Sequence, residues 1–476
     1  MAEEPNESGK GINKAMIWCG IALLLSIIIL LLPTPEGLSP KGHRFFGLLA
    51  LILTLWVSEA IPIGITALLA GGGLIAFGVQ SPSSAWMPFS SAAVMYVLML
   101  IMFGVIIEQV GLAKRILNFI LKKAGTNVRR MSLFLAVSST LLATVFHDAT
   151  VTIIMLYSII PVFRAMGITP NTSTRLSKFF VLLIPLAASA GGFGTYLGGG
   201  RNPITVEILH RMTGIDVGFT QFMIYNFPMA LFTAFVTWGI LWLIFRPDVK
   251  ELPAKLVTKE LPPMGRNEKL VLWLFIAAFA LWSFTDLTKI QVSVVAATVL
   301  AAIFALRLVD WMETVKNFPW ESWLVFGAGV SLGTAMLESG AGLWLANIFL
   351  PVFIGGPWPI LFLGCGLLGS ILTSMMSNTA AAALILPITI PLAHGLGLDP
   401  APIALGAPVT CSFVMLVIGC PPTIIAYSTG YFRQIDFIKV AIPWATANIV
   451  AVTLLVSVYW PLIHFGNLPL FGFIHF

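Results

Sequence analysis

The sequence is short of charge. Charged residues make up 10% of the 476 positions, whereas hydrophobic residues make up 58% and the mean hydropathy is +0.96. A soluble domain carries about 25% charged residues, so this chain could not cover a water-exposed surface with polar groups. Disorder is excluded as well, because disordered segments combine low hydrophobicity with high charge. The composition indicates an integral membrane protein.

Cysteine and the groups that enzymes use are also scarce. The four cysteines all lie in apolar stretches, where reduced, buried thiols are expected rather than disulfides. The few histidines lack the spacing of a zinc site, and the glycine runs at 71–73 and 198–200 lack the Lys-Ser/Thr of a phosphate loop. The sequence therefore argues against an enzyme.

What the sequence has instead is long apolar runs. The runs at 17–32, 231–245 and 449–463 approach the ~17–25 residues that a spanning helix needs. Barrel strands would alternate apolar and polar residues over ~10 positions, so we expect an all-α polytopic membrane protein. Mixed charge precedes the first run and no small-residue cleavage site follows it, so we expect a retained helix rather than a signal peptide.

A charged, proline-containing stretch separates two halves of the chain. We predict an N-terminal segment with the first transmembrane helix (1–44), a first repeat (45–246), a cytoplasmic linker (247–268) and a second repeat (269–476). Each repeat is expected to contain a re-entrant hairpin and a broken helix. These lie at about 132–163 and 178–212 in the first repeat, and at about 358–396 and 401–430 in the second.

Lysine and arginine set the orientation, because they collect on the cytoplasmic side of membrane proteins. If both hairpins dip into the membrane and return, only Lys41, Arg44, Arg211 and Lys289 fall outside, with Arg201 at membrane depth. This favours about eleven spans, two repeats of inverted topology, a cytoplasmic N-terminus and an external C-terminus in the plasma (cell inner) membrane. The pI of about 9.2 follows from the same bias, so no nucleic-acid partner is expected.

The two halves carry polar groups at matching places. The first has Phe146-His147-Asp148-Ala149-Thr150 and then Gly198-Gly199-Gly200-Arg201-Asn202-Pro203. The second has Met376-Ser377-Asn378-Thr379-Ala380 and then Gly419-Cys420-Pro421-Pro422-Thr423. Interrupted apolar segments in matching positions are the best sequence pointer to a transporter's binding site. Helix N-termini that face each other at such tips would favour a bound anion. Alternatively, the polar side chains of the tips only cap the helices that follow them.

Arg201 is the most informative single residue. A charge at the bilayer centre costs roughly 2.5–3.5 kcal/mol, so we expect this arginine to line a cavity where the helix unwinds. Its planar guanidinium can bind both oxygens of a carboxylate ligand. The alternative role is a structural ion pair with Asp148. His147 is either a ligand, by its match to Ser377, or a packing residue. Asp148 is expected to partner Arg201 or His147 rather than an anion.

Four tryptophans lie near the ends of apolar segments, where tryptophan commonly marks the edge of the bilayer. We interpret them as interfacial anchors: Trp56, Trp86, Trp311 and Trp320.

These motifs resemble a known family. Trp56-Val57-Ser58-Glu59-Ala60-Ile61-Pro62, followed by Thr66-Ala67-Leu68-Leu69, is similar to a W-x-[ST]-E-A-I-P…T-A-L-L segment of the divalent anion/sodium symporter (DASS) family. Ser377-Asn378-Thr379 matches its second hairpin tip, and Cys420-Pro421-Pro422-Thr423 resembles its second turn, with Thr423 in place of Asn. The resemblance implies eleven spans, inverted repeats, a homodimer in the lipid bilayer and elevator-type transport of di- or tricarboxylates.

The resemblance also implies which residues form the sites. The substrate would be bound by His147, Asp148, Ala149, Gly199, Arg201, Asn202, Ser377, Asn378, Thr379, Pro422 and Thr423. A residual sodium site would use Thr373, Asn378, Cys420 and Pro422.

The first half departs from the family's sodium-coupled members, which carry Ser-Asn-Thr in both hairpins. Here the tip reads His147-Asp148-Ala149, and Arg201 follows in the turn. Sodium needs several oxygen ligands, and a fixed guanidinium would repel it, so we expect no cofactor and no sodium requirement. An empty carrier would also have to move an uncompensated Arg201. If moving the unpaired guanidinium costs roughly 3 kcal/mol, the return of the empty carrier slows by about two powers of ten. This argument fails if Asp148 already pairs with the arginine.

The sequence thus predicts a secondary active transporter of di-/tricarboxylates of the succinate, malate and 2-oxoglutarate class, acting by sodium-independent obligatory exchange. Two alternatives stay open. One is a sodium-coupled dicarboxylate symporter that uses only the second-half sodium site, and the other is a transporter of an inorganic oxyanion such as sulfate. Broken inverted repeats favour alternating access over a channel.

Overall fold

The structure of the protein is a computed structural model that describes residues 8–58, 60–253, 262–284, 288, 290–354, 356–465 and 468. Within these ranges the regular structure is helical, apart from one isolated bridge between Asn127 and Glu251. The all-α class expected from the sequence is therefore confirmed. Glu59 of the tryptophan motif lies outside the described residues, as do parts of the expected N-terminal segment (1–7) and linker (254–261).

Two similar sets of helices follow one another along the chain. The first set is α1 (Ser8–Leu31), α2 (Pro40–Ser58), α3 (Ile63–Ala76), α4 (Pro82–Trp86), α5 (Ala92–Gln109), α6 (Leu112–Ala124), α7 (Val128–Ala143), α8 (Asp148–Ala165), α9 (Arg175–Gly191), α10 (Arg201–Thr213) and α11 (Phe219–Phe245). The second set is α13 (Arg266–Ser283), α15 (Val292–Ala305), α16 (Trp311–Lys316), α17 (Trp320–Glu338), α18 (Ala341–Phe353), α19 (Trp358–Met375), α20 (Asn378–Gly395), α21 (Pro400–Thr410), α22 (Pro421–Ser428) and α23 (Gln434–Leu462).

The order of elements repeats between the two sets. In each, a helix turns at a glycine of positive φ into a second helix: α5 into α6 at Gly111 (+84°), and α17 into α18 at Gly340 (+74°). Glycine reaches such angles without the steric cost that a Cβ would bring. A helical hairpin (α7–α8, α19–α20), a broken helix (α9–α10, α21–α22) and a long helix (α11, α23) then follow. The expected hairpins and broken helices are present, and the repeat boundaries at 45–246 and 269–476 stay a prediction.

Several of the described helices can cross a membrane by length and composition. Six pass this test alone, and the bent pair Trp323–Glu338 and Ala341–Phe353, which meets at 71°, brings the number to as many as seven. Three further apolar helices are shorter: Ala15–Leu31, Ile63–Ala76 and Val292–Ala305. The chain is a multi-pass membrane protein. Because the test passes over short and interrupted helices, the count of about eleven spans stays a prediction.

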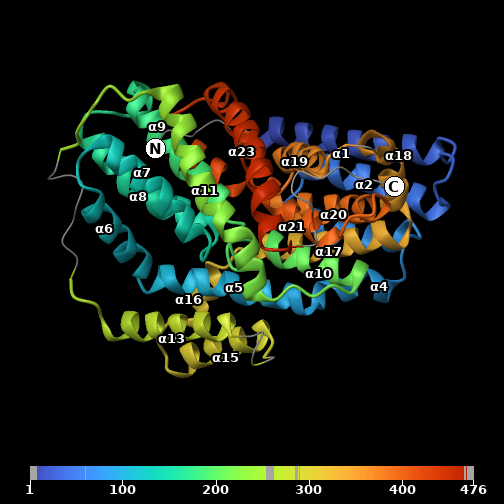
Figure 1. Cartoon of the computed structure of the whole chain (residues 1–476), viewed down its shortest axis with the longest axis horizontal. Coiled ribbons are helices and arrows are strands. Elements are labelled where there is room, and N and C mark those ends of the chain that lie inside the picture. The colour runs from blue at the N-terminus through green and yellow to red at the C-terminus, as the bar shows by residue number, and fades with distance from the viewer. Residues whose placement is uncertain are drawn as a thin grey trace.

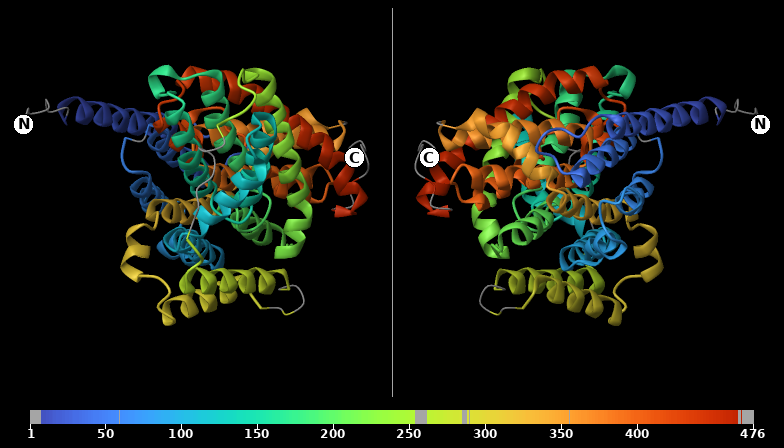
Figure 2. Two further views of the ribbon diagram at one scale, coloured as in Figure 1. Left: turned by 90° about the vertical axis from the view of Figure 1, so that its left-hand side faces the viewer. Right: turned by 90° about the vertical axis from the view of Figure 1, so that its right-hand side faces the viewer.

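The two hairpins lie on opposite sides of α23. Figure 1 shows α7, α8, α9 and α11 grouped at one end and α19, α20 and α21 toward the other, with α23 between the two groups. Helices α11 and α19 both pack against α23, while α13 and α15 form a separate pair along one edge. Figure 2 shows α1 on the outside of the molecule, where it packs against α2.

The first hairpin is held against the broken helix by a very close backbone approach. A Cβ on Gly191, at the end of α9, would lie 2.3 Å from the carbonyl oxygen of Thr140 in α7. One turn earlier, the Thr140 hydroxyl donates to the carbonyl oxygen of Ala187 (2.9 Å). Both contacts are buried, so neither backbone can move aside without disturbing the hairpin.

We expect Gly191→Ala to destabilise the protein, because the added methyl group forces α7 and α9 apart and overpacking typically costs about 1–3 kcal/mol. The measurement is the thermal unfolding midpoint of the detergent-purified protein. Gly239→Ala in α11 is the matched control, since nothing lies within 4 Å of its added Cβ. This control should keep or raise the midpoint, and equal midpoints for both variants would contradict the close approach.

Candidate functional site

Four helices begin at the hairpin tips and helix breaks. Helix α8 begins at Asp148, α10 at Arg201, α20 at Asn378 and α22 at Pro421. The first three starts meet directly, because the Arg201 side chain contacts Asp148 and Asn378. Each helix N-terminus carries roughly half a positive charge and free N–H groups. Their convergence makes this region favourable for an anion.

The tips are shaped by local capping. His147 precedes α8, and its Nδ1 accepts the backbone N–H of Ala149 (3.3 Å). Ser377 precedes α20 in the same way, and its hydroxyl accepts the N–H of Ala380 (3.3 Å). The capping role that the sequence left open for these tips is therefore present. His147 Nδ1 also lies 3.3 Å from Asp148 Oδ1, so Nδ1 is held at the tip and Nε2 is the ring nitrogen left to face a ligand.

Arg201 joins the two tips. Its Nη1 lies 3.5 Å from Asp148 Oδ2 on the first tip. On the second tip, the Asn378 amide nitrogen donates to the hydroxyl oxygen of Thr373 (2.6 Å) and to the carbonyl oxygen of Cys411 (3.1 Å). The side-chain oxygen of Asn378 accepts from Arg201 Nη1 (3.0 Å). Arg201 Nη2 donates to the carbonyl oxygen of Ser189 (3.1 Å). One guanidinium is thus shared by both tips and the end of α9.

The position of Arg201 differs from the sequence expectation in one respect. Arg201 is 2% exposed and is enclosed by protein rather than lining one of the cavities described below. The oxygens around it explain this burial, because a buried guanidinium needs acceptors and an opposite charge. Its ion pair with Asp148 confirms the alternative reading, and Asp148 partners Arg201 as expected. The guanidinium Nε has no hydrogen-bond partner among the described residues.

Asn202 stabilises the break between α9 and α10. Its amide nitrogen donates to the carbonyl oxygens of Gly192 (2.8 Å) and Thr195 (2.6 Å) in the unwound segment. The hydroxyl of Thr195 in turn donates to the carbonyl oxygen of Thr144, beside the first tip. The second tip is close as well, since a Cβ on Gly200 would lie 3.0 Å from Thr379 Oγ1. Asn202 therefore fixes the loop that brings Arg201 to both tips.

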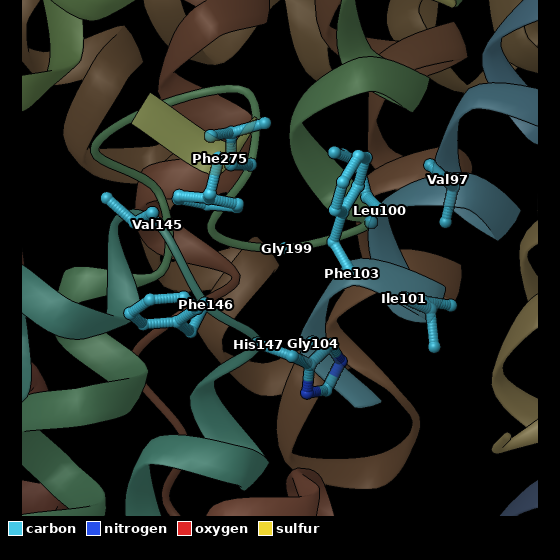
Figure 3. Close-up of a pocket in the computed structure, with 12 residues that line it drawn as sticks. Val97, Leu100, Ile101, Phe103, Gly104, Val145, Phe146, His147, Gly199 and Phe275 are labelled. Carbon is cyan, nitrogen blue, oxygen red and sulfur yellow. The ribbon is translucent and has the colours of Figure 1, made fainter. Parts of the chain in front are cut away.

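A cavity of about 450 Å³ lies beside the first tip. Its walls come from α5 (Leu100, Phe103), the tip itself (Phe146), the break (Gly199) and α13, whose Phe275 stacks on Phe146 at 5.7 Å. Figure 3 shows His147 as the polar side chain among these labelled apolar neighbours. The His147 side chain is 33% exposed. It can therefore present its Nε2 edge to an occupant of this cavity.

A second cavity of about 530 Å³ lies beside the other tip. It is lined by Trp56 of α2, by Ser377 of the tip, and by Cys420 and Pro421 at the start of α22. Trp56 is only 6% exposed, so its interpretation as an interfacial anchor is wrong. Trp86, Trp311 and Trp320 are 39%, 50% and 45% exposed, and their interpretation as interfacial anchors stays a prediction.

The residues expected for a residual sodium site are held in internal hydrogen bonds. The amide of Asn378 is shared by Thr373, Cys411 and Arg201. The Thr423 hydroxyl donates to the carbonyl oxygens of Val417 (2.6 Å) and Cys420 (2.8 Å). Pro422 is buried beside them. Among the described residues, no group of three or more His, Cys, Asp or Glu could hold a metal ion.

The structure adds site residues that the sequence analysis missed. Ser189 contributes its carbonyl oxygen to Arg201, while its hydroxyl donates to the carbonyl oxygen of Ser412 (2.8 Å) and lies 3.9 Å from Cys420 Sγ. Ser189 thereby ties the two breaks together. A serine two residues before the Gly191-Gly192 pair, in an otherwise apolar helix end, was the available signal.

Comparisons with known proteins agree on one family. The family model described as the sodium:sulfate symporter transmembrane region matches residues 14–465. A sodium-dependent dicarboxylate transporter, SdcS, of Staphylococcus saprophyticus is 27% identical over 473 residues, covering 92% of this chain and 90% of the relative. SdcS of Staphylococcus aureus (strain USA300) is 28% identical over 441 residues, covering 86% and 84%.

A solved structure supports the fold. The crystal structure of the Alcanivorax borkumensis YdaH transporter, described as having an unusual topology, matches with a TM-score of 0.55 and 14% identity. The match covers 96% of this chain and all of that one. With a family model that spans almost the whole sequence, the chain belongs to the sodium:sulfate symporter, or divalent anion/sodium symporter, family and is a transporter rather than an enzyme.

Proposed function

We propose that the protein is a secondary active transporter that exchanges dicarboxylate anions of the succinate, malate and 2-oxoglutarate class without sodium. Two relatives of similar length are named as dicarboxylate transporters, which supports the substrate class. The converging helix N-termini support an anionic ligand, and the partly exposed imidazole of His147 lies at the first tip, where it can contact that ligand. The observation that carries sodium independence is the guanidinium of Arg201, held among oxygens from both tips.

Those oxygens resemble the ligand set of a hard cation. Asp148 offers a carboxylate, Asn378 an amide oxygen and Ser189 a carbonyl oxygen, and hard cations prefer such ligands. Arg201 already occupies the space between them. At ~4 Å, an effective dielectric of about 20 gives a repulsion of roughly 4 kcal/mol between two unit charges. A sodium ion would therefore bind here at a large disadvantage.

The ion pair between Asp148 and Arg201 bears on obligatory exchange. The pair largely compensates its own charge, so an empty carrier does not move a bare guanidinium. What remain uncompensated are the positive ends of the converging helices. A dicarboxylate satisfies these groups and an empty site does not, so the loaded carrier crosses more readily.

The remaining expectations belong to the same proposal. His147 on the first tip, and Ser377 and Thr379 on the second, are proposed to contact the anion. Asp148, Arg201 and Asn202 position the tips. Elevator movement of the hairpins, a homodimer, the cell membrane location, a cytoplasmic N-terminus and an external C-terminus are proposed from the family resemblance and the charge bias.

Two rival functions each have support. The sodium-dependent names of the SdcS relatives favour a symporter that couples through the second half. The description of the family model favours sulfate as a substrate. In the second half, the candidate oxygens of Thr373 and Cys420 are already used in hydrogen bonds, which weakens the first rival.

Uptake into proteoliposomes tests the proposal. We expect labelled succinate to enter vesicles preloaded with unlabelled dicarboxylate, at the same rate with and without sodium, and to enter empty vesicles very slowly. Sodium-driven uptake into empty vesicles would instead show that the second half still couples transport. Vesicles without protein provide the background rate.

Competition tests the substrate class in the same vesicles. Unlabelled succinate and malate should block uptake of labelled succinate, whereas sulfate in equal excess should not, because the two tips offer donors for two separated carboxylates. Strong inhibition by sulfate would favour the oxyanion rival.

Replacement of Arg201 tests its role. Arg201→Gln should lower exchange by about 100-fold or more, because it leaves the buried Asp148 unpaired and the two tips unlinked. The double variant Arg201→Gln/Asp148→Asn removes that unpaired charge and should fold normally, yet still fail to exchange. Arg211→Gln on the same helix is the control, since its partly exposed pair with Glu207 (2.7 Å) contributes little. Normal exchange by the double variant would refute the role.

A further inference from the structure

Exposed cations gather where α6 turns into α7. They form a surface that we call the basic corner: Lys122, Lys123, Arg129, Arg130 and Lys250. Lys250 joins the others from the segment after α11, because its carbonyl oxygen accepts the backbone N–H of Val128 (2.9 Å). The basic corner is therefore built by the fold from two parts of the chain that are far apart in sequence.

Carboxylates do not neutralise the basic corner. No Asp or Glu occurs in the sequence between Glu108 and Asp148, and Asp248 and Glu251 flank Lys250. Among the described residues, none of the five cations forms an ion pair with a carboxylate, although other exposed cations of the protein do. Two of the cations also lie in the first turn of α7, where the helix dipole disfavours positive charge. The corner thus keeps an excess of positive charge that an anion would relieve.

Aromatic rings lie directly beside these cations. Lys123 lies over the ring of Phe119, 6.0 Å from its centroid, and Arg130 lies 5.8 Å from the ring centroid of Phe134. The two phenylalanines are 63% and 39% exposed, so they give the corner an apolar border. Exposed rings with cations above them are typical of a bilayer surface, where the rings rest on lipid and the charges reach the headgroups.

The matching corner of the second set of helices lacks these features. From Gly340 to Trp358, where α18 turns into α19, the sequence contains no Lys, Arg, Asp or Glu. A turn of this kind therefore does not require charge. Helix α6 has buried apolar residues on one side, Leu112, Ile120 and Ala124, and exposed cations at its end. Helices that lie in the plane of a membrane surface have this distribution.

We infer that the basic corner binds the phosphate headgroup of an anionic phospholipid, whichever anion the protein transports. The unpaired cations attract the phosphate, and the exposed rings contact the acyl chains that a soluble anion lacks. In the proposed orientation with a cytoplasmic N-terminus, this lipid lies in the cytoplasmic leaflet. Because α7 leads from the corner to the first tip, the lipid also fixes the start of the first hairpin at the membrane surface.

Thermal unfolding in detergent tests the binding. Dioleoylphosphatidylglycerol should raise the unfolding midpoint more than dioleoylphosphatidylcholine does, because a ligand of the folded state stabilises it. In Lys122→Gln/Lys123→Gln, the phosphatidylglycerol concentration that gives half of this rise should increase roughly 25-fold, about fivefold for each cation removed. Each variant is compared with itself in the two lipids, so a change in its own stability cancels.

A charge-matched variant and a soluble anion make the test specific. Arg307→Gln/Lys316→Gln removes two exposed cations outside the corner and should respond to phosphatidylglycerol as wild type does. Inorganic phosphate at the same concentration should leave the midpoint unchanged. Equal effects of the two lipids on wild type, equal responses of the two double variants, or a full effect of inorganic phosphate would each overturn the inference.

A fluorescence experiment keeps all five cations in place. Phe119→Cys is made in a chain with Cys19→Ser and Cys365→Ser and is labelled with bimane, while Cys411 and Cys420 are buried. Brominated phosphatidylglycerol at a low mole fraction should quench the label more strongly than brominated phosphatidylcholine at the same fraction. Equal quenching by the two lipids would show that the corner does not select an anionic headgroup and would overturn the inference.

Discussion

The arrangement of the centre depends on one buried guanidinium. Arg201 begins α10, and its guanidinium contacts Asp148 on the first hairpin and Asn378 on the second. It also donates to the carbonyl oxygen of Ser189 at the end of α9. Each partner lies on a different segment of an interrupted element. Burying such a charge is favourable only where acceptors and an opposite charge are already fixed, so the tips and the break constrain one another.

The rest of the site is made of helix ends. His147 and Ser377 cap the helices that follow them, and Asn202 satisfies carbonyl groups that the broken helix leaves open. These local contacts leave other N–H groups of the same helix starts available. Proteins commonly bind anions in this way, with backbone donors and helix dipoles rather than with a dense cluster of cationic side chains. Here the single cation is already committed to structure.

Much of this could be predicted from the sequence. Polar residues inside apolar runs marked both tips and both breaks, and the charge of Arg201 at membrane depth suggested a partner such as Asp148. The contact of Arg201 with Asn378 could not be predicted, because it joins residues far apart in the chain that only tertiary packing brings together. The role of the Ser189 carbonyl oxygen could not be predicted either, because every residue has one and only the serine hydroxyl stands out in the sequence. Trp56 was misread because a tryptophan at the end of an apolar run looks the same whether lipid or protein covers it.

The ion pair between Arg201 and Asp148 also limits how such a site can evolve. Either residue alone would leave a buried, unpaired charge, which typically costs about 3–5 kcal/mol. A lineage that passes between a bound cation and a fixed guanidinium must therefore change both positions nearly together, or cross a poorly folding intermediate. Arginine and aspartate at these two positions should consequently be inherited as a unit.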